Sequence, residues 1–170
     1  MTRAQLLQAA ALLLGLLSLP ACSPGLNWRT VQLGHLSALL PCKPDHASRP
    51  VTLAGQTVEM EMAGCETAGM LFAISRTRAA DATQAAQLMA ALRQATLAQV
   101  QAAAVHPMPN SGDAQTSFDV RLDGKRSDGT GLQARVQWRT QGAEVYQIAA
   151  YGTHLDSAQT EPLFGEAHLQ

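Results

Sequence analysis

Aromatic and charged side chains are scarce in this chain of 170 residues. It contains two Trp, two Tyr and three Phe, and charged residues make up 15% of it, with 12 Lys and Arg against 13 Asp and Glu. Such a balanced charge excludes the basic surface of a nucleic-acid binder and the charge excess of a disordered tail. Because 46% of the residues are apolar, the length suits one globular domain and is short for two.

Common catalytic motifs are also missing. The chain has no Gly-x-Ser-x-Gly elbow, phosphate-binding loop, dinucleotide fingerprint or His-Glu-x-x-His sequence. The five histidines are scattered, without the close pairing that zinc sites use, at His35, His46, His106, His154 and His168. We therefore expect no enzymatic activity, no cofactor and no metal.

The longest apolar run lies near the amino terminus and is too short to span a membrane. It follows a short cationic start at Arg3, covers residues 9–19 and ends at Pro20, whereas a transmembrane helix needs about 20 apolar residues. This is the pattern of an export signal. The next residues, Leu19-Pro20-Ala21-Cys22, resemble the lipobox of bacterial lipoproteins, with Pro20 as a mild departure.

In that family the cysteine thiol takes a diacylglycerol and the freed amine takes a further acyl chain, and several chains anchor a protein stably. The resemblance implies that residues 1–21 are a signal peptide, residues 22–27 a lipid anchor at Cys22 with its tether, and residues 28–170 a single periplasmic domain. Ser23, which stands where an inner-membrane retention signal has Asp, implies the periplasmic face of the outer membrane. The alternative is an ordinary secretory signal cut near Ala21, which leaves Cys22 a thiol.

The two remaining cysteines, Cys42 and Cys65, form an even pair once Cys22 is acylated. In an oxidising compartment two such thiols are expected to pair, so we predict a Cys42–Cys65 disulfide. The alternative is a reactive thiol at Cys42, because Lys43 can favour its thiolate. No Cys-x-x-Cys spacing is present to indicate a redox catalyst.

Apolar periodicity predicts strands and helices through the rest of the chain. Alternation predicts strands at 57–62, 117–122 and 132–139, and continuous apolar character predicts a strand at 69–76 covered on both faces and another at 145–152. Pro41, Pro44 and Pro50 predict a loop. The pattern predicts one strong helix at 81–104, capped by Asp81 and Gln84. It predicts a second, short helix at 156–165. The predicted core face of the long helix comprises Ala85, Leu88, Met89, Leu92, Thr96, Val100 and Ala103.

The order of these elements predicts an α+β fold, in which an antiparallel sheet carries one long helix and a short C-terminal helix, mainly on one face. We expect a turn at 123–124, so that 117–152 forms a meander. Several motifs resemble uncharacterised proteobacterial lipoproteins, which are similar to the PsbP-like α/β/α sandwich. These motifs are Trp28, 40–44, 64–66, 68–70, 145–147 and 162–164. The resemblance carries no catalytic residue.

Two clusters of charged residues could carry chemistry on the solvated sheet face. Glu59 and Glu61 share a strand face, which a solvated surface explains more often than acid–base chemistry does. Arg135 and Arg139, with Arg121 on an adjoining strand, could bind an anion or a partner because guanidinium groups recognise carboxylates and phosphates. The alternative is that these arginines and glutamates pair with each other.

These observations leave two functional hypotheses. The first is a non-enzymatic envelope lipoprotein that binds a protein partner or assists assembly, with an exposed apolar or arginine-bearing patch. The second is a carrier of a small apolar or anionic ligand, held in a pocket between helix and sheet. Its predicted lining is Met60, Met62, Leu88, Met89 and Trp138, which can equally be ordinary core.

Overall fold

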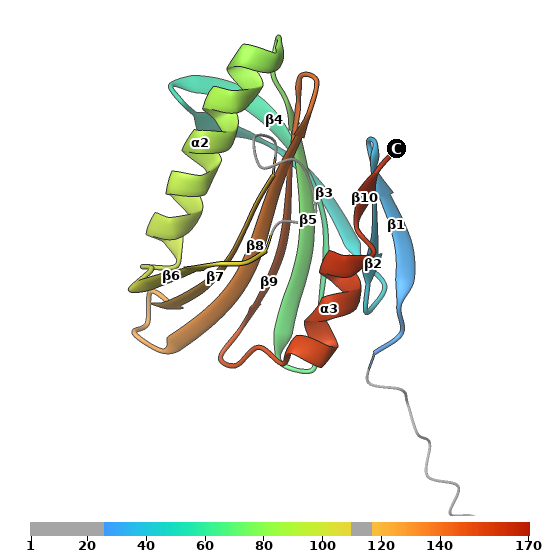
Figure 1. Cartoon of the computed structure of the whole chain (residues 1–170), viewed down its shortest axis with the longest axis vertical. Coiled ribbons are helices and arrows are strands. Elements are labelled where there is room, and N and C mark those ends of the chain that lie inside the picture. The colour runs from blue at the N-terminus through green and yellow to red at the C-terminus, as the bar shows by residue number, and fades with distance from the viewer. Residues whose placement is uncertain (1–25, 110–116) are drawn as a thin grey trace, which may run out of the picture.

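The computed structural model describes residues 26–109 and 117–170, in which ten strands and two helices form two antiparallel sheets with helices packed against them (Figure 1). The mixture of helices with antiparallel strands that the sequence predicts is therefore confirmed. The predicted anchor at Cys22 and the signal before it lie outside the described residues.

The larger sheet has seven strands in the order β3-β4-β5-β9-β8-β7-β6, and every neighbouring pair is antiparallel. Its strands are β3 (Asp45–Leu53), β4 (Gln56–Thr67), β5 (Met70–Arg78), β6 (Ala104–Pro107), β7 (Ser117–Lys125), β8 (Gly131–Gln141) and β9 (Glu144–Gly152). The predicted apolar strand at 69–76 is β5, which lies in the interior of this sheet between β4 and β9.

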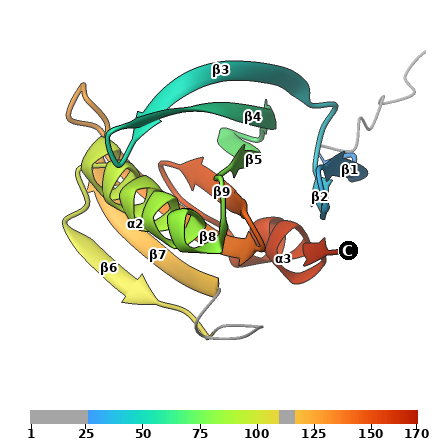
Figure 2. The same cartoon turned by 90° about the horizontal axis from the view of Figure 1, so that it is seen from above.

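Helix α2 (Ala82–Gln99) packs against one face of this sheet, which curls around it. Seen from above, β3 and β4 lie on one side of the helix and β7 and β6 on the other (Figure 2). The predicted cap is confirmed: the Asp81 side chain accepts a hydrogen bond of 2.8 Å from the backbone N–H of Gln84. Six of the predicted core positions are buried, from Ala85 to Val100, whereas Ala103 is exposed.

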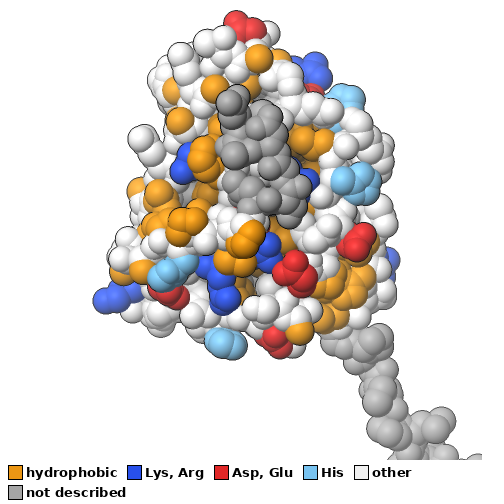
Figure 3. Space-filling view, viewed as in Figure 1, with side chains coloured by type: hydrophobic (Ala, Val, Ile, Leu, Met, Phe, Trp, Pro, Cys, Tyr) orange, Lys and Arg blue, Asp and Glu red, His pale blue; other side chains and the backbone are white. Residues whose placement is uncertain are grey.

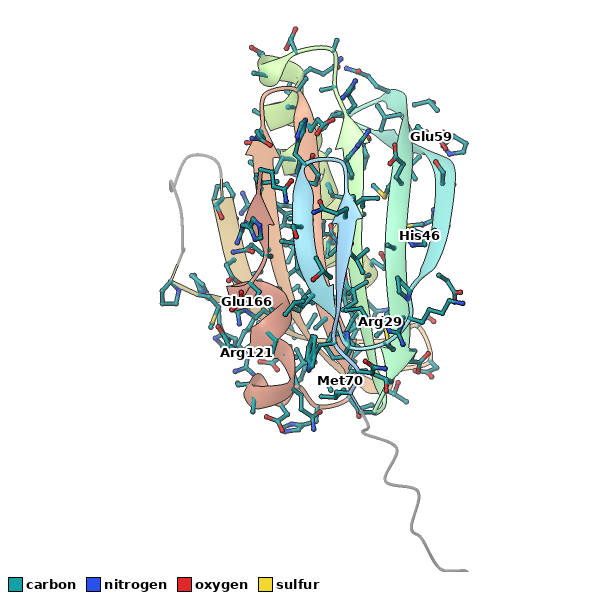
Figure 4. The ribbon with its side chains drawn as sticks, turned by 90° about the vertical axis from the view of Figure 1, so that its right-hand side faces the viewer. Arg29, His46, Glu59, Met70, Arg121 and Glu166 are labelled. Atoms are coloured by element: carbon teal, nitrogen blue, oxygen red, sulfur yellow. A yellow bond between two sulfur atoms is a disulfide. The ribbon has the colours of Figure 1, made fainter. Side chains whose placement is uncertain are left out.

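The opposite face of the large sheet is covered by a small sheet and the second helix. The small sheet pairs β1 (Arg29–Leu33), β2 (Leu36–Leu40) and β10 (His168–Leu169) in the order β1-β2-β10, and α3 (Ser157–Gly165) lies beside it (Figure 4). Both contribute to one apolar cluster with strands β4, β5 and β9. The expectation that the helices pack mainly on one face is therefore wrong, because α2 and α3 lie on opposite faces of the large sheet.

The β1–β2 turn presses tightly on the large sheet. Gly34 has φ +59°, and a Cβ on it would lie 2.4 Å from Nη1 of Arg76 and 2.9 Å from the hydroxyl of Tyr146. Only glycine combines this left-handed backbone with so close an approach.

Two segments predicted as loops or helix are edge strands. Pro50 lies inside β3, and Pro107 ends β6, and these two strands form the two edges of the seven-stranded sheet. An edge strand has one side without a ladder partner, so it tolerates a residue that has no N–H to donate. Helix α2 ends at Gln99 and not at the predicted Ala104, which belongs to β6.

The predicted turn at 123–124 is also wrong, since β7 continues to Lys125. Gly124 is required for a close approach to the end of α2, because a Cβ there would lie 2.1 Å from the carbonyl oxygen of Val100. The backbone N–H of Lys125 donates to that same oxygen at 2.8 Å. Here glycine indicates contact between two backbones and not a change of chain direction.

Candidate functional site

A groove lies between the carboxyl-terminal half of α2 and the concave face of the large sheet. It consists of two cavities of about 430 and 500 Å³, here the first and the second cavity. Leu71, Gln99 and Tyr151 line both. These three residues therefore mark where the cavities adjoin.

Small side chains open the first cavity. Ala73 and Ser75 of β5 face the helix, and Ala95 of α2 lies among the residues opposite them. On β8 the corresponding space is filled by Trp138, which is 1% exposed. The same helix thus packs tightly on one half of the sheet and stands clear of the other half, because the sheet presents a large residue in one place and small ones in the other.

A chain of hydrogen bonds forms the polar floor of the first cavity. The indole Nε1 of Trp138 donates to Oε1 of Gln147 at 2.9 Å. The hydroxyl of Thr96 is shared between the carbonyl oxygen of Leu92, at 2.8 Å, and the same Gln147 oxygen, at 3.2 Å. The Nε2 group of Gln147 donates to the hydroxyl of Tyr151 at 3.3 Å. The Gln147 amide is thereby held in one orientation by β8, α2 and β9.

Burial raises the pKa of the Tyr151 hydroxyl to about 12, although the hydrogen bond from Gln147 opposes the shift. Since that hydroxyl accepts from Gln147, its own proton stays available for a molecule in the groove. Ser75 contributes a second hydroxyl on the same wall.

Charge is sparse along the groove. Among the described residues that line the first cavity, Arg49 of β3 alone is charged. The second cavity is lined by Arg126 and Asp128. The carboxylate of Asp128 accepts hydrogen bonds from the hydroxyl and the backbone N–H of Thr130, at 2.7 and 2.9 Å, and these hold the pKa of that carboxyl below its usual value.

The predicted pocket is found in part. Met60 and Met62 line the first cavity, whereas Leu88, Met89 and Trp138 are buried in the core beside it. Sequence reasoning missed Gln147, Tyr151 and Ser75. The available signal was their place on the helix-facing side of two central strands, where an apolar residue is the rule.

The three arginines proposed as an anion-binding patch do not share an open face. Arg135 has a side chain only 12% exposed, and it donates to Asp119 at 3.2 and 2.9 Å and to Glu161 at 2.8 Å. Arg139 donates to the carbonyl oxygen of Ala167 at 2.7 Å, and burial lowers the pKa of its guanidinium. Arg121 lies beside Arg135 across the β7–β8 ladder. The expectation that this face is wet is wrong, because α3 and the segment after it cover it.

The paired carboxylates are separated into different contacts. Glu59 accepts a hydrogen bond from Ser48, and Glu61 lies 3.3 Å from the guanidinium of Arg76. Arg76 also approaches Glu144, which is 3.8 Å away. The alternative that these glutamates pair with Arg121, Arg135 or Arg139 is not seen among the ion pairs between described residues, because Glu61 pairs with Arg76 and Arg135 pairs with Asp119 and Glu161.

The predicted disulfide is present and joins the two sheets. Cys42 follows β2, Cys65 lies in β4, and their sulfur atoms are bonded. In the two described ranges no group of three or more His, Cys, Asp or Glu side chains is arranged to hold a metal ion. Within those ranges, neither helix has the length and apolarity needed to cross a membrane.

No protein-family model matches this sequence, and no curated protein is significantly similar to it. The groove and its contacts are therefore the features from which a function can be inferred.

Proposed function

We propose that this protein is a non-enzymatic envelope lipoprotein whose domain binds a small, largely apolar ligand in the groove between α2 and the sheet. The observation that carries the proposal is the first cavity, of about 430 Å³, with apolar walls and a fixed polar floor at Gln147 and Tyr151. Ligand sites in proteins are typically concave, mostly apolar and equipped with a few oriented polar groups.

The lining favours binding over catalysis. None of the described residues that line the first cavity is a histidine, a cysteine or a carboxylate, and these are the groups that most often serve as acid, base or nucleophile. Its one phenol, Tyr151, has a pKa raised to about 12 by burial. The groups present can orient a ligand by hydrogen bonds without reacting with it.

The proposed cellular location of the protein rests on its sequence. We propose that Cys22 carries the lipid, that the anchor lies in the outer membrane, and that the domain faces the periplasm. The Cys42–Cys65 disulfide supports an oxidising compartment. The helix on one face of the sheet and α3 on the other support the resemblance to the PsbP-like sandwich.

The partner-binding hypothesis called for an exposed apolar or arginine-bearing patch. Among the described residues, the exposed large apolar side chains are Leu71 and Val105, at 43% and 46%. Hydrophobic side chains are interspersed with charged ones over the face shown in Figure 3. Leu71 lies in the groove, so its exposure favours a ligand there, which would cover it.

A fluorescence titration tests the proposal. The mature chain with Cys22→Ser (residues 22–170), which lacks both the apolar signal and the acyl acceptor, is titrated without detergent with the apolar probe N-phenyl-1-naphthylamine. We expect saturable enhancement at one site. Ala95→Trp, which places an indole in the first cavity, should weaken it by about tenfold or more, since the probe and the indole compete for one volume.

The matched control is Ala98→Trp, on the same helix, exposed and outside both cavities. It should leave probe binding unchanged, and urea unfolding verifies that both variants fold. No saturable binding, or equal loss in both variants, would show that the groove is not a ligand site.

A further inference from the structure

We infer that the groove takes a single acyl chain with an anionic head, with the head at Arg49 and the chain running past Tyr151 and Leu71 into the second cavity. The inference rests on the proposed function of the groove as a ligand site and adds the chemical class and the orientation of the ligand.

The shape of the groove favours a linear chain. The two cavities adjoin at Leu71, Gln99 and Tyr151 and extend to opposite sides of these residues, toward β3 in one direction and toward the β7–β8 turn in the other. Beyond this point the second cavity is lined by the apolar side chains of Val100 and Leu132 and by three polar residues of the β7–β8 turn, Arg126, Ser127 and Asp128. A compact ring system would fill one cavity, whereas a flexible chain can follow both and bury the exposed Leu71.

The charge of the groove favours an anion at the end of the first cavity where Arg49 lies. Arg49 is in register with Met60, which is buried on the helix-facing side of β4, so Arg49 also stands on that side. No carboxylate is found among the described residues that line this cavity, and none of the ion pairs between described residues involves Arg49. A guanidinium group that has no counter-ion among the described residues, at the mouth of an apolar cavity, matches a carboxylate or a phosphate.

The direction of the groove in the molecule also agrees with the proposed anchor at Cys22. Met70, which precedes Leu71, lies at the lower end of the molecule, whereas Glu59, which precedes the partner of Arg49, lies in the upper part (Figure 4). The described chain begins near that lower end (Figure 1). Between Cys22 and Asn27 an extended chain reaches at most about 18 Å, so an anchor at Cys22 would hold the second cavity close to the bilayer with the head site away from it.

Chain-length dependence tests the first part of the inference. Octanoate, decanoate and dodecanoate are used to displace the naphthylamine probe from the mature Cys22→Ser chain (residues 22–170). We expect affinity to rise about fourfold per added methylene, because each one is buried in the groove. Palmitate and lysophosphatidylglycerol then distinguish a free fatty acid from a lipid headgroup as the source of the anion, and tighter binding of one identifies it.

Arg49→Gln tests the head site, with Lys43→Gln as a control on an exposed cation outside both cavities. We expect Arg49→Gln to weaken the binding of dodecanoate about tenfold, through loss of a charge-assisted hydrogen bond. The affinity for dodecanol should be unchanged. Lys43→Gln should change neither.

If the probe binds in the groove but affinity does not depend on chain length, the acyl chain is wrong and the proposed function stands. If Arg49→Gln weakens the binding of dodecanoate and of dodecanol equally, the assignment of the head site to Arg49 is wrong. If neither probe nor alkanoate binds, the inference and the proposed function both fail.

Discussion

The hydroxyl of Tyr146 accepts a hydrogen bond of 3.0 Å from the backbone N–H of His35, and it donates one to the carboxylate of Glu144. Tyr146 belongs to β9 and His35 to the β1–β2 turn, so one buried phenol ties the small sheet to the large one. The contact explains why the turn approaches so closely that Gly34 has no room for a side chain.

Tyr146→Phe should therefore destabilise the fold by about 1 to 3 kcal/mol, because it leaves the His35 N–H without its partner and removes one hydrogen bond from the Glu144 carboxylate, which keeps Arg78. Urea unfolding followed by circular dichroism measures the change as a lower midpoint with an unchanged slope. An unaltered midpoint would mean that water replaces the phenol and that the contact is not what holds the turn.

Acid should weaken the same region. Burial by itself raises the pKa of Glu144, but the hydrogen bonds from Tyr146 and Arg78 and the positive charge of Arg76 outweigh it and hold that pKa below its ordinary value. A group whose folded pKa is lowered contributes stability that is complete above its unfolded pKa and is lost as pH falls through the folded pKa.

We therefore expect the urea midpoint of the protein to fall below about pH 4.5, and to fall less steeply in Glu144→Gln. Glu66→Gln, at an exposed position of β4, is the control and should keep the slope of the parent. Parallel curves for all three proteins would contradict the role of Glu144.

Removing the disulfide should lower stability by about 3 kcal/mol, given the 23 residues that separate Cys42 and Cys65. The double variant Cys42→Ser/Cys65→Ser isolates this effect, and its midpoint should match that of the reduced parent. Two titratable thiols in protein isolated from a periplasm without reductant would show that the bond does not form in the cell.

Arg135→Met should destabilise the fold by about 3 to 5 kcal/mol, because it leaves the carboxylate of Asp119, whose side chain is 1% exposed, without its charge partner. The double variant Arg135→Met/Asp119→Leu should recover most of that loss. Arg121→Met, which removes a neighbouring arginine, provides the comparison. If the double variant is no more stable than Arg135→Met, the loss comes from packing and not from the unpaired charge of Asp119.

The elements that could be predicted are those whose pattern reflects one buried face. The alternation in β8 and the stripe in α2 correctly place Val136, Trp138 and Leu88 in the core. The disulfide followed from cysteine parity once Cys22 was set aside. These predictions rest on local periodicity or on counting, both of which are visible in sequence.

The predictions that were wrong depend on which other elements pack beside a strand or over its face. Pro50 breaks a pattern only if its strand is interior, and the sequence does not state which strands are edges. Arg135 appears solvated until α3 supplies Glu161 from 26 residues away. The floor of the groove depends on which residues of β5 and β9 meet beneath α2, which is a property of the sheet order and not of any single strand.

The most direct test of the ligand site is native mass spectrometry of the mature Cys22→Ser chain (residues 22–170), exported to a periplasm behind a secretory signal that is cleaved off, and kept unreduced. We predict a stoichiometric extra mass, either as isolated or after incubation with excess dodecanoate, that is absent from Ala95→Trp and present in Ala98→Trp. A bare protein in every preparation, or an extra mass that both variants keep, would contradict the claim that the groove beneath α2 is a ligand site.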